Sequence, residues 1–400
     1  MPHLSAKDGV LRIALAGTRG VPARYGGFET AVEEIGRRLV DRGHDVVVYC
    51  RATEDPVEDR YLGMRRVTLP ALRRRSLETL SHTGLSVGHL LAHRVDAAFV
   101  FNAANAPFLP LLRAARIPVA THVDGLEWKR AKWGGAGRRY YRGAEAAAVR
   151  WSDALIADAP GIAAYYEQEF GAATRQIAYG APIIEQIETD RLDPLGLRPG
   201  AYHLVVARFE PENHVREIVA GYVASGARLP LVVVGGAPYA EEYTDRVRAA
   251  AADDPRVRFL GSVWDSVQLD QLYAHALTYL HGHSVGGTNP SLLRAIGAGA
   301  ATAAFDVAFN HDVLGELGTY FADEAGVARA VEAAEGDVAA TQAVGLASRE
   351  RARDYDWDSV TDGYEQLARD LVARNVPGRQ RARRRPAGDV ADPIPASVAR

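Results

Sequence analysis

The 400-residue sequence contains very little cysteine and no long apolar run. Its single cysteine, Cys50, excludes an internal disulfide and any metal site built from several cysteines. No stretch approaches the ~18 consecutive apolar residues of a membrane-spanning helix, and the first residues lack the basic and apolar regions of a signal peptide. We therefore expect the protein to remain in the cytoplasm.

Several common catalytic signatures are also missing. The sequence has no P-loop lysine, no HExxH helix and no Ser-His-Asp order, which disfavours the common hydrolases and phosphoryl-transfer enzymes. The segment 17–20 is not GxGxxG, and Tyr49-Cys50-Arg51 stands where an NAD site needs an acidic residue. His281 and His283 would point to opposite faces of an extended segment, so we expect neither a metal nor a bound cofactor.

The charge is distributed unevenly along the chain, although the net charge is only −3. Residues 1–185 hold 25 Lys and Arg against 20 Asp and Glu, whereas residues 186–375 hold 16 against 28. This asymmetry argues against nucleic acid along the whole surface and favours an anionic partner or membrane surface for the first half. Unrelated surface solvation is the alternative explanation.

Short apolar segments alternate with helical patterns in both halves, which predicts two parallel, doubly wound α/β sheets. The predicted strands are 46–49, 97–101, 118–122, 154–157, 204–207, 231–235, 257–260 and 277–280. Prolines between 182 and 200 suggest a boundary, so we expect domains at 1–190 and 191–359. The arginine-rich segment 376–400 has no periodicity and is predicted to be a disordered basic tail.

A glycine-rich turn precedes a predicted helix in the second domain. Gly286 and Gly287 allow the backbone to approach a ligand, Thr288 or Asn289 can cap the helix, and Pro290 suits its first position. Free amides and the positive end of the helix dipole would then face a phosphate. The turn therefore predicts an anion site.

A second glycine-rich turn lies about 260 residues earlier, where the apolar segment 11–16 is followed by residues 17–29 and a helical pattern. The order is again strand, loop and helix. Two such units suggest two Rossmann-like domains that face a cleft and share one ligand there.

Arg208 follows the predicted strand at 204–207, at the carboxyl edge where a ligand would lie. A guanidinium at this position can bind a diphosphate. The alternative is a surface ion pair with Glu210 or Glu212.

Residues 121–133 place polar, charged and aromatic side chains in one loop after a predicted strand. We expect His122 to bind a sugar hydroxyl or a transition-state charge, and Asp124 and Glu127 to bind hydroxyls. Lys129 and Arg130 would contact an anionic acceptor. A buried, satisfied His122 and a Trp133 that only packs remain open as alternatives.

Arg73-Arg74-Arg75 and the leucines that follow can form a basic amphipathic helix suited to a membrane surface. The alternative is a solvated helix that packs through its apolar stripe.

These segments resemble retaining GT-B glycosyltransferases of family 4, over roughly residues 10–372. They resemble more narrowly a branch that begins with GTRGxPxxYGGFE and includes bacterial rhamnosyltransferases of polysaccharide assembly. The matching segments are 17–29, 124–130, 207–213 and 282–290. The resemblance implies transfer of a sugar, with rhamnose as the guess from the branch, from a nucleotide diphosphate to a lipid-linked saccharide or glycan hydroxyl. It implies retention of configuration, and we expect the enzyme to need no metal. With the basic segments described above, we expect a cytoplasmic protein that can be peripheral to the inner face of the cell membrane.

The residues and the resemblance together assign roles to particular positions. The catalytic set would be His122, Arg208 and Asp124. Donor binding would fall to Gly26, Gly27, Asn213, Gly286, Gly287, Thr288, Asn289 and Arg294, and acceptor binding to Tyr25, Glu127, Lys129 and Arg130. A helix at about 360–375 would pack back on the first domain.

Two positions depart from the family pattern. Asn213 replaces a common lysine five residues after Arg208, and Gly286 and Arg294 replace a Glu-x7-Glu pair. These departures leave open a catalytically inactive nucleotide-sugar-binding partner protein. A nucleotide-sugar epimerase is a further alternative.

Overall fold

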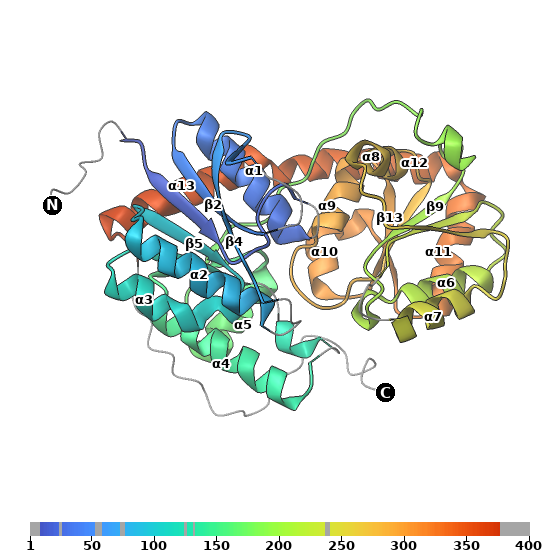
Figure 1. The fold of residues 1–400 in the computed structure, drawn as a ribbon. Helices are drawn as coiled ribbons and strands as arrows, with labels where there is room; N and C mark the ends of the chain where they lie inside the picture. The colour runs from blue at the N-terminus through green and yellow to red at the C-terminus, as the bar shows by residue number, and fades with distance from the viewer. Residues whose placement is uncertain are drawn as a thin grey trace. The chain divides into compact units, whose positions relative to one another are not determined.

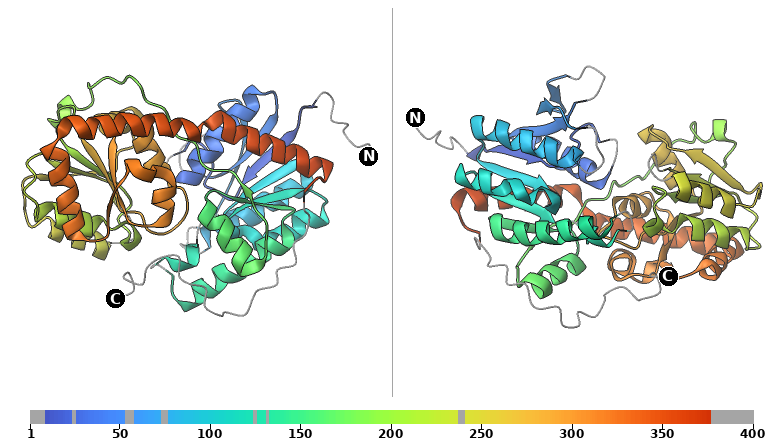
Figure 2. Two further views of the ribbon diagram at one scale, coloured as in Figure 1. Left: turned by 180° about the vertical axis from the view of Figure 1, so that it is seen from behind. Right: turned by 60° about the horizontal axis from the view of Figure 1, so that its bottom comes forward.

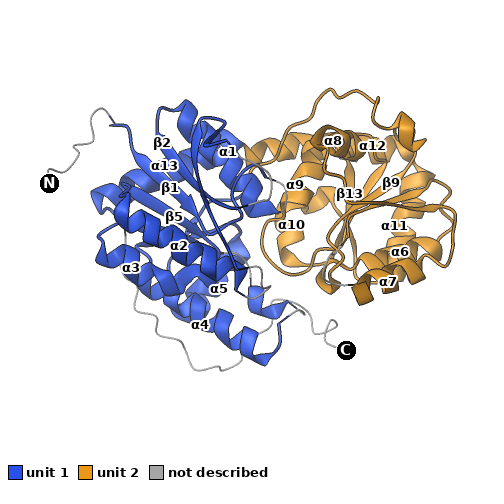
Figure 3. Cartoon of the chain, viewed as in Figure 1, with its two compact units in different colours: residues 1–179, 357–390 blue, residues 180–356, 391–400 orange. Residues whose placement is uncertain are grey.

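The computed structural model describes residues 9–23, 26–52, 58–72, 77–123, 126–130, 133–236 and 241–376. They form two compact units (Figure 3): unit 1 contains the chain up to Tyr179 and again from Trp357, and unit 2 contains Gly180–Asp356. The chain therefore changes units at 179/180 and 356/357, whereas the sequence placed the boundaries at 190 and 359. The predicted tail lies outside the described residues beyond Val376.

Unit 1 has, in its described part, an eight-stranded sheet in the order β3-β4-β2-β1-β5-β6-β7-β8. All neighbours are parallel except the pair β3 and β4. The strands are β1 (Arg12–Ala16), β2 (Asp45–Arg51), β3 (Arg60–Tyr61), β4 (Met64–Leu69), β5 (Ala97–Phe101), β6 (Val119–Val123), β7 (Ala154–Ala157) and β8 (Arg175–Gln176).

Helices cover both faces of this sheet (Figures 1 and 2). Alternate strand residues such as Ala98 and Val100 pack in one layer with α2, α4 and α5, whereas Phe99 contacts α13 on the other face. The helices are α1 (Gly27–Asp41), α2 (Glu78–Ala92), α3 (Leu109–Ala114), α4 (Gly135–Trp151), α5 (Pro160–Phe170) and α13 (Trp357–Ala373). The buried strands thus carry apolar side chains on both faces, as parallel sheets require.

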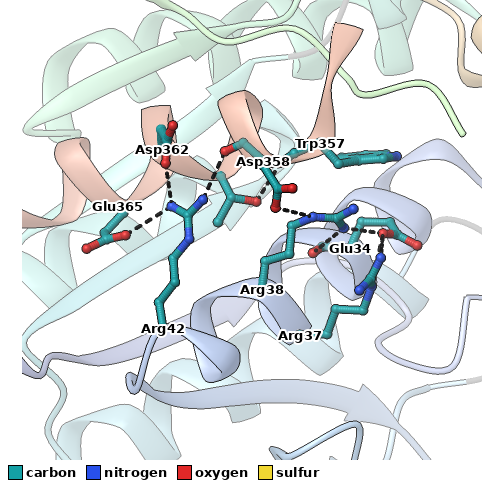
Figure 4. A network of polar contacts seen from close by, with 9 residues as sticks. Glu34, Arg37, Arg38, Arg42, Trp357, Asp358, Asp362 and Glu365 are labelled. Carbon is teal, nitrogen blue, oxygen red and sulfur yellow. Dashed lines mark hydrogen bonds and ion pairs between the residues drawn. The ribbon is translucent and has the colours of Figure 1, made fainter. Parts of the chain in front are cut away.

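Helix α13 packs on unit 1 because its apolar residues recur at helical spacing. Its buried residues are Trp357, Val360, Thr361, Tyr364, Leu367, Ala368 and Leu371. On its polar side, Arg38 Nε lies 2.9 Å from Asp358 Oδ1, and Arg42 Nη1 lies 2.7 Å from Asp362 Oδ1 and 3.0 Å from Glu365 Oε2 (Figure 4). The two arginines come from α1, so ion pairs join the first and last helices of unit 1.

Replacing Arg42 with alanine should lower the free energy of unfolding of unit 1 by about 1–2 kcal/mol, because hydrogen bonds to charged partners are lost. Amide hydrogen exchange in α13 should become faster as a result. Arg37→Ala is the matched control, since Arg37 pairs with Glu34 of its own helix at 2.7 Å (Figure 4) and should cost about 0.5 kcal/mol or less. Equal effects of the two substitutions would contradict the anchoring role of Arg42.

Unit 2 has a six-stranded parallel sheet among its described residues, in the order β11-β10-β9-β12-β13-β14. The strands are β9 (His203–Val206), β10 (Leu231–Val234), β11 (Val257–Gly261), β12 (Thr278–His281), β13 (Ala301–Phe305) and β14 (Thr319–Phe321). The helices are α6 (Val215–Val223), α7 (Glu241–Ala250), α8 (Ser266–Ala274), α9 (Pro290–Gly297), α10 (Ala308–Leu314), α11 (Glu324–Gly336) and α12 (Val338–Ala352).

Helices also cover both faces of the sheet of unit 2 (Figure 1), and its core lies in two layers. Val205 and Val233 pack with α6, α7 and α11 in one layer, and Leu204 and Val232 pack with α8 and α9 in the other. Neighbouring residues of one strand thus face opposite layers, as the period of two in a strand dictates.

Candidate functional site

The order of the strands in unit 2 places a topological switch point between β9 and β12. From β9 the chain continues outward through β10 and β11, and it then crosses to β12 on the other side of β9. Ligands of open α/β sheets bind outside the carboxyl ends of the two strands at such a point. A ligand of unit 2 is therefore expected at the loops after Val206 and His281.

Arg208 lies in the first of these loops, two residues after the end of β9. Its side chain is 46% exposed, and Nη2 lies 3.5 Å from Glu210 Oε2. An exposed pair at this distance contributes little to stability, so the guanidinium can exchange Glu210 for a ligand anion at small cost. The structure thus contains the surface ion pair that the sequence left open, and the catalytic role of Arg208 stays a prediction.

The second loop ends in a capped helix, as the sequence predicted. Asn289 is the N-cap of α9, its Oδ1 accepts the Ser291 N–H at 2.9 Å, and Pro290 occupies the first helical position. Gly286 has a φ of +132°, a conformation that side chains with a Cβ rarely adopt. The glycine turn therefore leads directly into the positive end of a helix dipole, where anions are stabilised. Binding of the donor by Gly287, Thr288 and Asn289 stays a prediction.

Hydrogen bonds join the two loops into one platform. Nδ2 of Asn213 donates a hydrogen bond to the Arg208 carbonyl at 2.8 Å. Oδ1 of Asn213 lies 2.8 Å from His283 Nδ1, at hydrogen-bond distance. The Ser284 N–H donates to the Glu212 carbonyl at 2.9 Å. Asn213 is 6% exposed, and both ends of its amide have partners inside the protein. Asn213 is therefore placed to support the loop that carries Arg208. Its contact with the donor stays a prediction.

Arg294 points to a neighbouring helix. Its Nη2 lies 2.6 Å from Asp270 Oδ1 of α8, and its Nε donates to the same oxygen at 2.7 Å. The charge of the Arg294 guanidinium is therefore paired within unit 2. Its predicted contact with a donor is untested.

Unit 1 has its own switch point, between β1 and β5. A Cβ on Gly17 would lie 2.4 Å from the Phe101 carbonyl oxygen, so only glycine lets the loop after β1 approach the end of β5. The Arg19 N–H donates to Glu29 Oε1 at 3.0 Å, so a carboxylate from the first turn of α1 holds this loop. This role of Glu29 was not predicted from the sequence, although its place in the first turn of the helix was visible there.

Gly26 and Gly27 lie at the start of α1. Gly26 is the N-cap in an extended conformation, and Gly27 is the first helical residue. Both therefore stand at the positive end of a 15-residue helix, and their predicted contact with the donor is untested. Tyr25, predicted to bind the acceptor, lies outside the described residues.

His122 lies near the carboxyl end of β6, one strand beyond β5. Its side chain is buried, and Nδ1 lies 2.9 Å from the Tyr364 hydroxyl of α13. Burial lowers the pKa of His122 to about 3, so the imidazole is neutral at physiological pH. Of the two interpretations that the sequence left open, the structure shows burial with one ring nitrogen paired. A catalytic contact of His122 stays a prediction, and Asp124, two residues later, lies outside the described residues.

Two of the other predicted acceptor residues, Glu127 and Arg130, contact each other. Arg130 Nε lies 2.5 Å from Glu127 Oε2, and the Trp133 indole N–H donates to Glu127 Oε1 at 3.3 Å. Lys129 Nζ lies 5.5 Å from the centre of the Trp128 ring. These contacts join described residues between Glu127 and Trp133, and the predicted binding of an acceptor by them is untested.

Helix α2 has an apolar outer surface. Leu77, which precedes it, and Leu85 and Leu91 are each more than 40% exposed, whereas Val87 and Leu90 are buried against the sheet. The Arg73-Arg74-Arg75 segment lies outside the described residues. Within the described part of the chain, no helix is both long enough and apolar enough to cross a membrane.

Comparison with known proteins identifies the fold. Residues 25–179, less than half of the chain, match the family model described as Glycosyltransferase Family 4. Sucrose-phosphate synthase from Thermosynechococcus elongatus has a similar structure, with a TM-score of 0.77 and 21% identity, over 91% of this chain and 99% of that one. The chain matches none of the curated proteins with which it was compared.

Two further structures agree with this result. Anabaena Alr3699/HepE, in complex with UDP-glucose, has a TM-score of 0.72 and 15% identity, over 90% of this chain and 100% of that one. The α,α-trehalose 6-phosphate synthase of Burkholderia multivorans has a TM-score of 0.68 and 13% identity, over 92% and 99% of the two chains. The protein therefore has the GT-B fold, with two Rossmann-like units, and this part of the sequence prediction is confirmed.

Proposed function

We propose that the protein is a glycosyltransferase that moves a sugar, rhamnose in the branch it resembles, from a nucleoside diphosphate to a hydroxyl of a lipid-linked saccharide or glycan. In this proposal unit 2 binds the donor and unit 1 the acceptor. The transfer retains the anomeric configuration and uses no metal.

One observation carries the proposal: Arg208 and the N-terminus of α9 follow the two strands at the switch point of unit 2. The loops that hold them are tied by the hydrogen bond between Asn213 and His283, at 2.8 Å. A guanidinium and a helix N-terminus on one rigid platform suit a diphosphate, whose oxygens accept several hydrogen bonds. The family match of residues 25–179 and the nucleotide-sugar complex of a similar structure add support.

The platform also suggests how the reaction is accelerated. As the bond between sugar and diphosphate breaks, negative charge grows on the leaving phosphate oxygen. Arg208 and the backbone amides at the start of α9 would be fixed before the reaction and would stabilise that charge. The rate enhancement would then come mainly from stabilisation of the leaving diphosphate, and no side chain of the protein would act as a nucleophile.

Thermal-shift measurements with nucleoside diphosphates and their sugars test donor binding. A ligand at 100 times its dissociation constant adds about 2.7 kcal/mol to the stability of the folded state. We expect stabilisation by a nucleoside diphosphate, reduced in Arg208→Ala, and release of nucleotide only when an acceptor is present. No stabilisation by any nucleoside diphosphate or its sugar would overturn the proposal.

Analysis of the reaction products separates the two alternatives. A catalytically inactive partner protein would bind the donor and never release nucleotide with any acceptor extract. An epimerase would convert the donor sugar with no acceptor present. Arg294 and Asn213, which prompted the first alternative, are paired with Asp270 and His283 within unit 2, and the side chain of Arg208 remains exposed beside them.

The exposed leucines of α2 support peripheral membrane binding as part of the same proposal, because an apolar helix surface can insert at a lipid interface. Flotation with anionic vesicles should carry the protein upward at low salt and less at high salt. Leu85→Glu should weaken this binding, and absence of binding at low salt would exclude it.

A further inference from the structure

His122 and Tyr364 form a buried hydrogen-bonded pair between parts of the chain that are 242 residues apart. Both residues are 1% exposed. The imidazole also lies among aromatic rings, with Tyr179 stacked at 5.6 Å and Phe28 edge-on at 5.3 Å between ring centres. These contacts fix the plane of the His122 ring, so its hydrogen bonds have defined directions.

The hydrogen-bonding groups of this pair determine which ring nitrogen carries the proton. His122 Nε2 is buried and has no hydrogen-bond partner among the described residues. If the Tyr364 hydroxyl donates to Nδ1, only the Nε2–H group is left without a partner. If Nδ1–H donates instead, both the Tyr364 proton and the Nε2 lone pair are left unused. Buried polar groups in native proteins are normally paired, so the first arrangement is favoured.

Tyr364 is itself held firmly. Its ring meets Phe99 of β5 edge-on, with 5.0 Å between ring centres, and it lies on the buried side of α13. The ion pairs of Arg38 and Arg42 fix the opposite side of the same helix (Figure 4). Because the helix is anchored, the Tyr364 hydroxyl stays beside Nδ1 of His122. A hydroxyl that donates to Nδ1 at all times keeps the imidazole in one tautomer.

We propose that Tyr364 is a positioning residue that holds His122 as the Nε2–H tautomer, so that His122 offers a hydrogen-bond donor and no base at the carboxyl edge of unit 1. The ligand group that matches such a donor is a neutral hydroxyl oxygen of a saccharide, and this part rests on the proposed function. With its Nε2 already protonated and its Nδ1 occupied by Tyr364, His122 does not take up the proton that an acceptor hydroxyl loses.

Nitrogen NMR of histidine-labelled protein tests the tautomer without any substrate. We expect the full-length parent to show His122 as a neutral ring protonated at Nε2. In Tyr364→Phe the ring should populate both tautomers, because the phenyl ring cannot donate. Tyr166→Phe is the matched control, since Tyr166 is an equally buried tyrosine of unit 1 that packs in the other core layer. A parent signal from Nδ1–H, or a spectrum that Tyr364→Phe leaves unchanged, would overturn the proposal.

Transfer kinetics test whether Tyr364 acts through His122. Tyr364→Phe should lower kcat/KM by about fivefold to tenfold, the value of one hydrogen bond. The same change should have little further effect in a His122→Gln chain, because the group that it positions is gone. Additive losses would contradict the coupling. If the parent transfers no sugar, the proposed function fails, and the NMR result still decides the tautomer.

Discussion

Arg208→Ala should reduce turnover about a hundredfold or more. Loss of one preorganised group that stabilises developing charge typically costs about 3 kcal/mol of transition-state stabilisation. The side chain is nearly half exposed and forms an ion pair with Glu210 at 3.5 Å, so the substitution should leave the fold of unit 2 intact. Steady-state kinetics with the donor identified by thermal shift would measure the loss of turnover. An unchanged free energy of unfolding would show that the loss does not come from a damaged fold.

Two variants sharpen this test. Arg208→Lys keeps a charge but loses the planar fork that binds two phosphate oxygens, so it should retain only part of the activity. Arg228→Ala removes an exposed arginine before the start of β10, at the opposite edge of the same sheet, and should have no effect. An Arg208→Ala chain within threefold of the parent would refute the role of this residue.

Gly235→Ala should destabilise unit 2 by about 3 kcal/mol or more. Gly235 follows β10 with a φ of +134°, and a Cβ there would lie 1.8 Å from the Ala207 carbonyl oxygen. The added methyl must therefore distort the backbone, which already has a conformation that side chains rarely adopt. Ala207 immediately precedes Arg208, so the distortion should also reduce turnover.

Chemical denaturation, with hydrogen exchange to assign the transition to unit 2, would measure this effect. The neighbouring variant Gly236→Ala is the matched control, because its Cβ would meet Ser262 Oγ at an ordinary 3.8 Å. We expect its unfolding free energy to stay within about 0.5 kcal/mol of the parent. Equal stabilities for the two variants would show that the chain after β10 relaxes easily.

The strands with clear β propensity could be predicted from the sequence. The valine-rich segment 231–235 and the aromatic segment 97–101 lie where β10 and β5 are found. The strand β13 (Ala301–Phe305) was missed, because its sequence ATAAF has few β-branched residues. It becomes a strand because it is buried between β12 and β14, where parallel pairing satisfies its backbone.

The site could be predicted only in part for a similar reason. A glycine turn before Asn289 and Pro290 encodes a capped helix locally, and the cap is present. The partners of Asn213 and Arg294 are 70 and 24 residues away in the chain, so no local pattern could identify them. The importance of Tyr364 was hidden in the same way.

The sequence alone determined the alternation of strands and helices, the two glycine turns and the placement of Arg208 after a strand, since each depends on neighbouring residues. Only the tertiary structure decided which polar side chains have protein partners and which ring nitrogen of His122 is engaged. Such pairing requires segments that are distant in the chain to lie close together. The packing of α13 on β5, and of the loop after β9 on the loop after β12, brings them together.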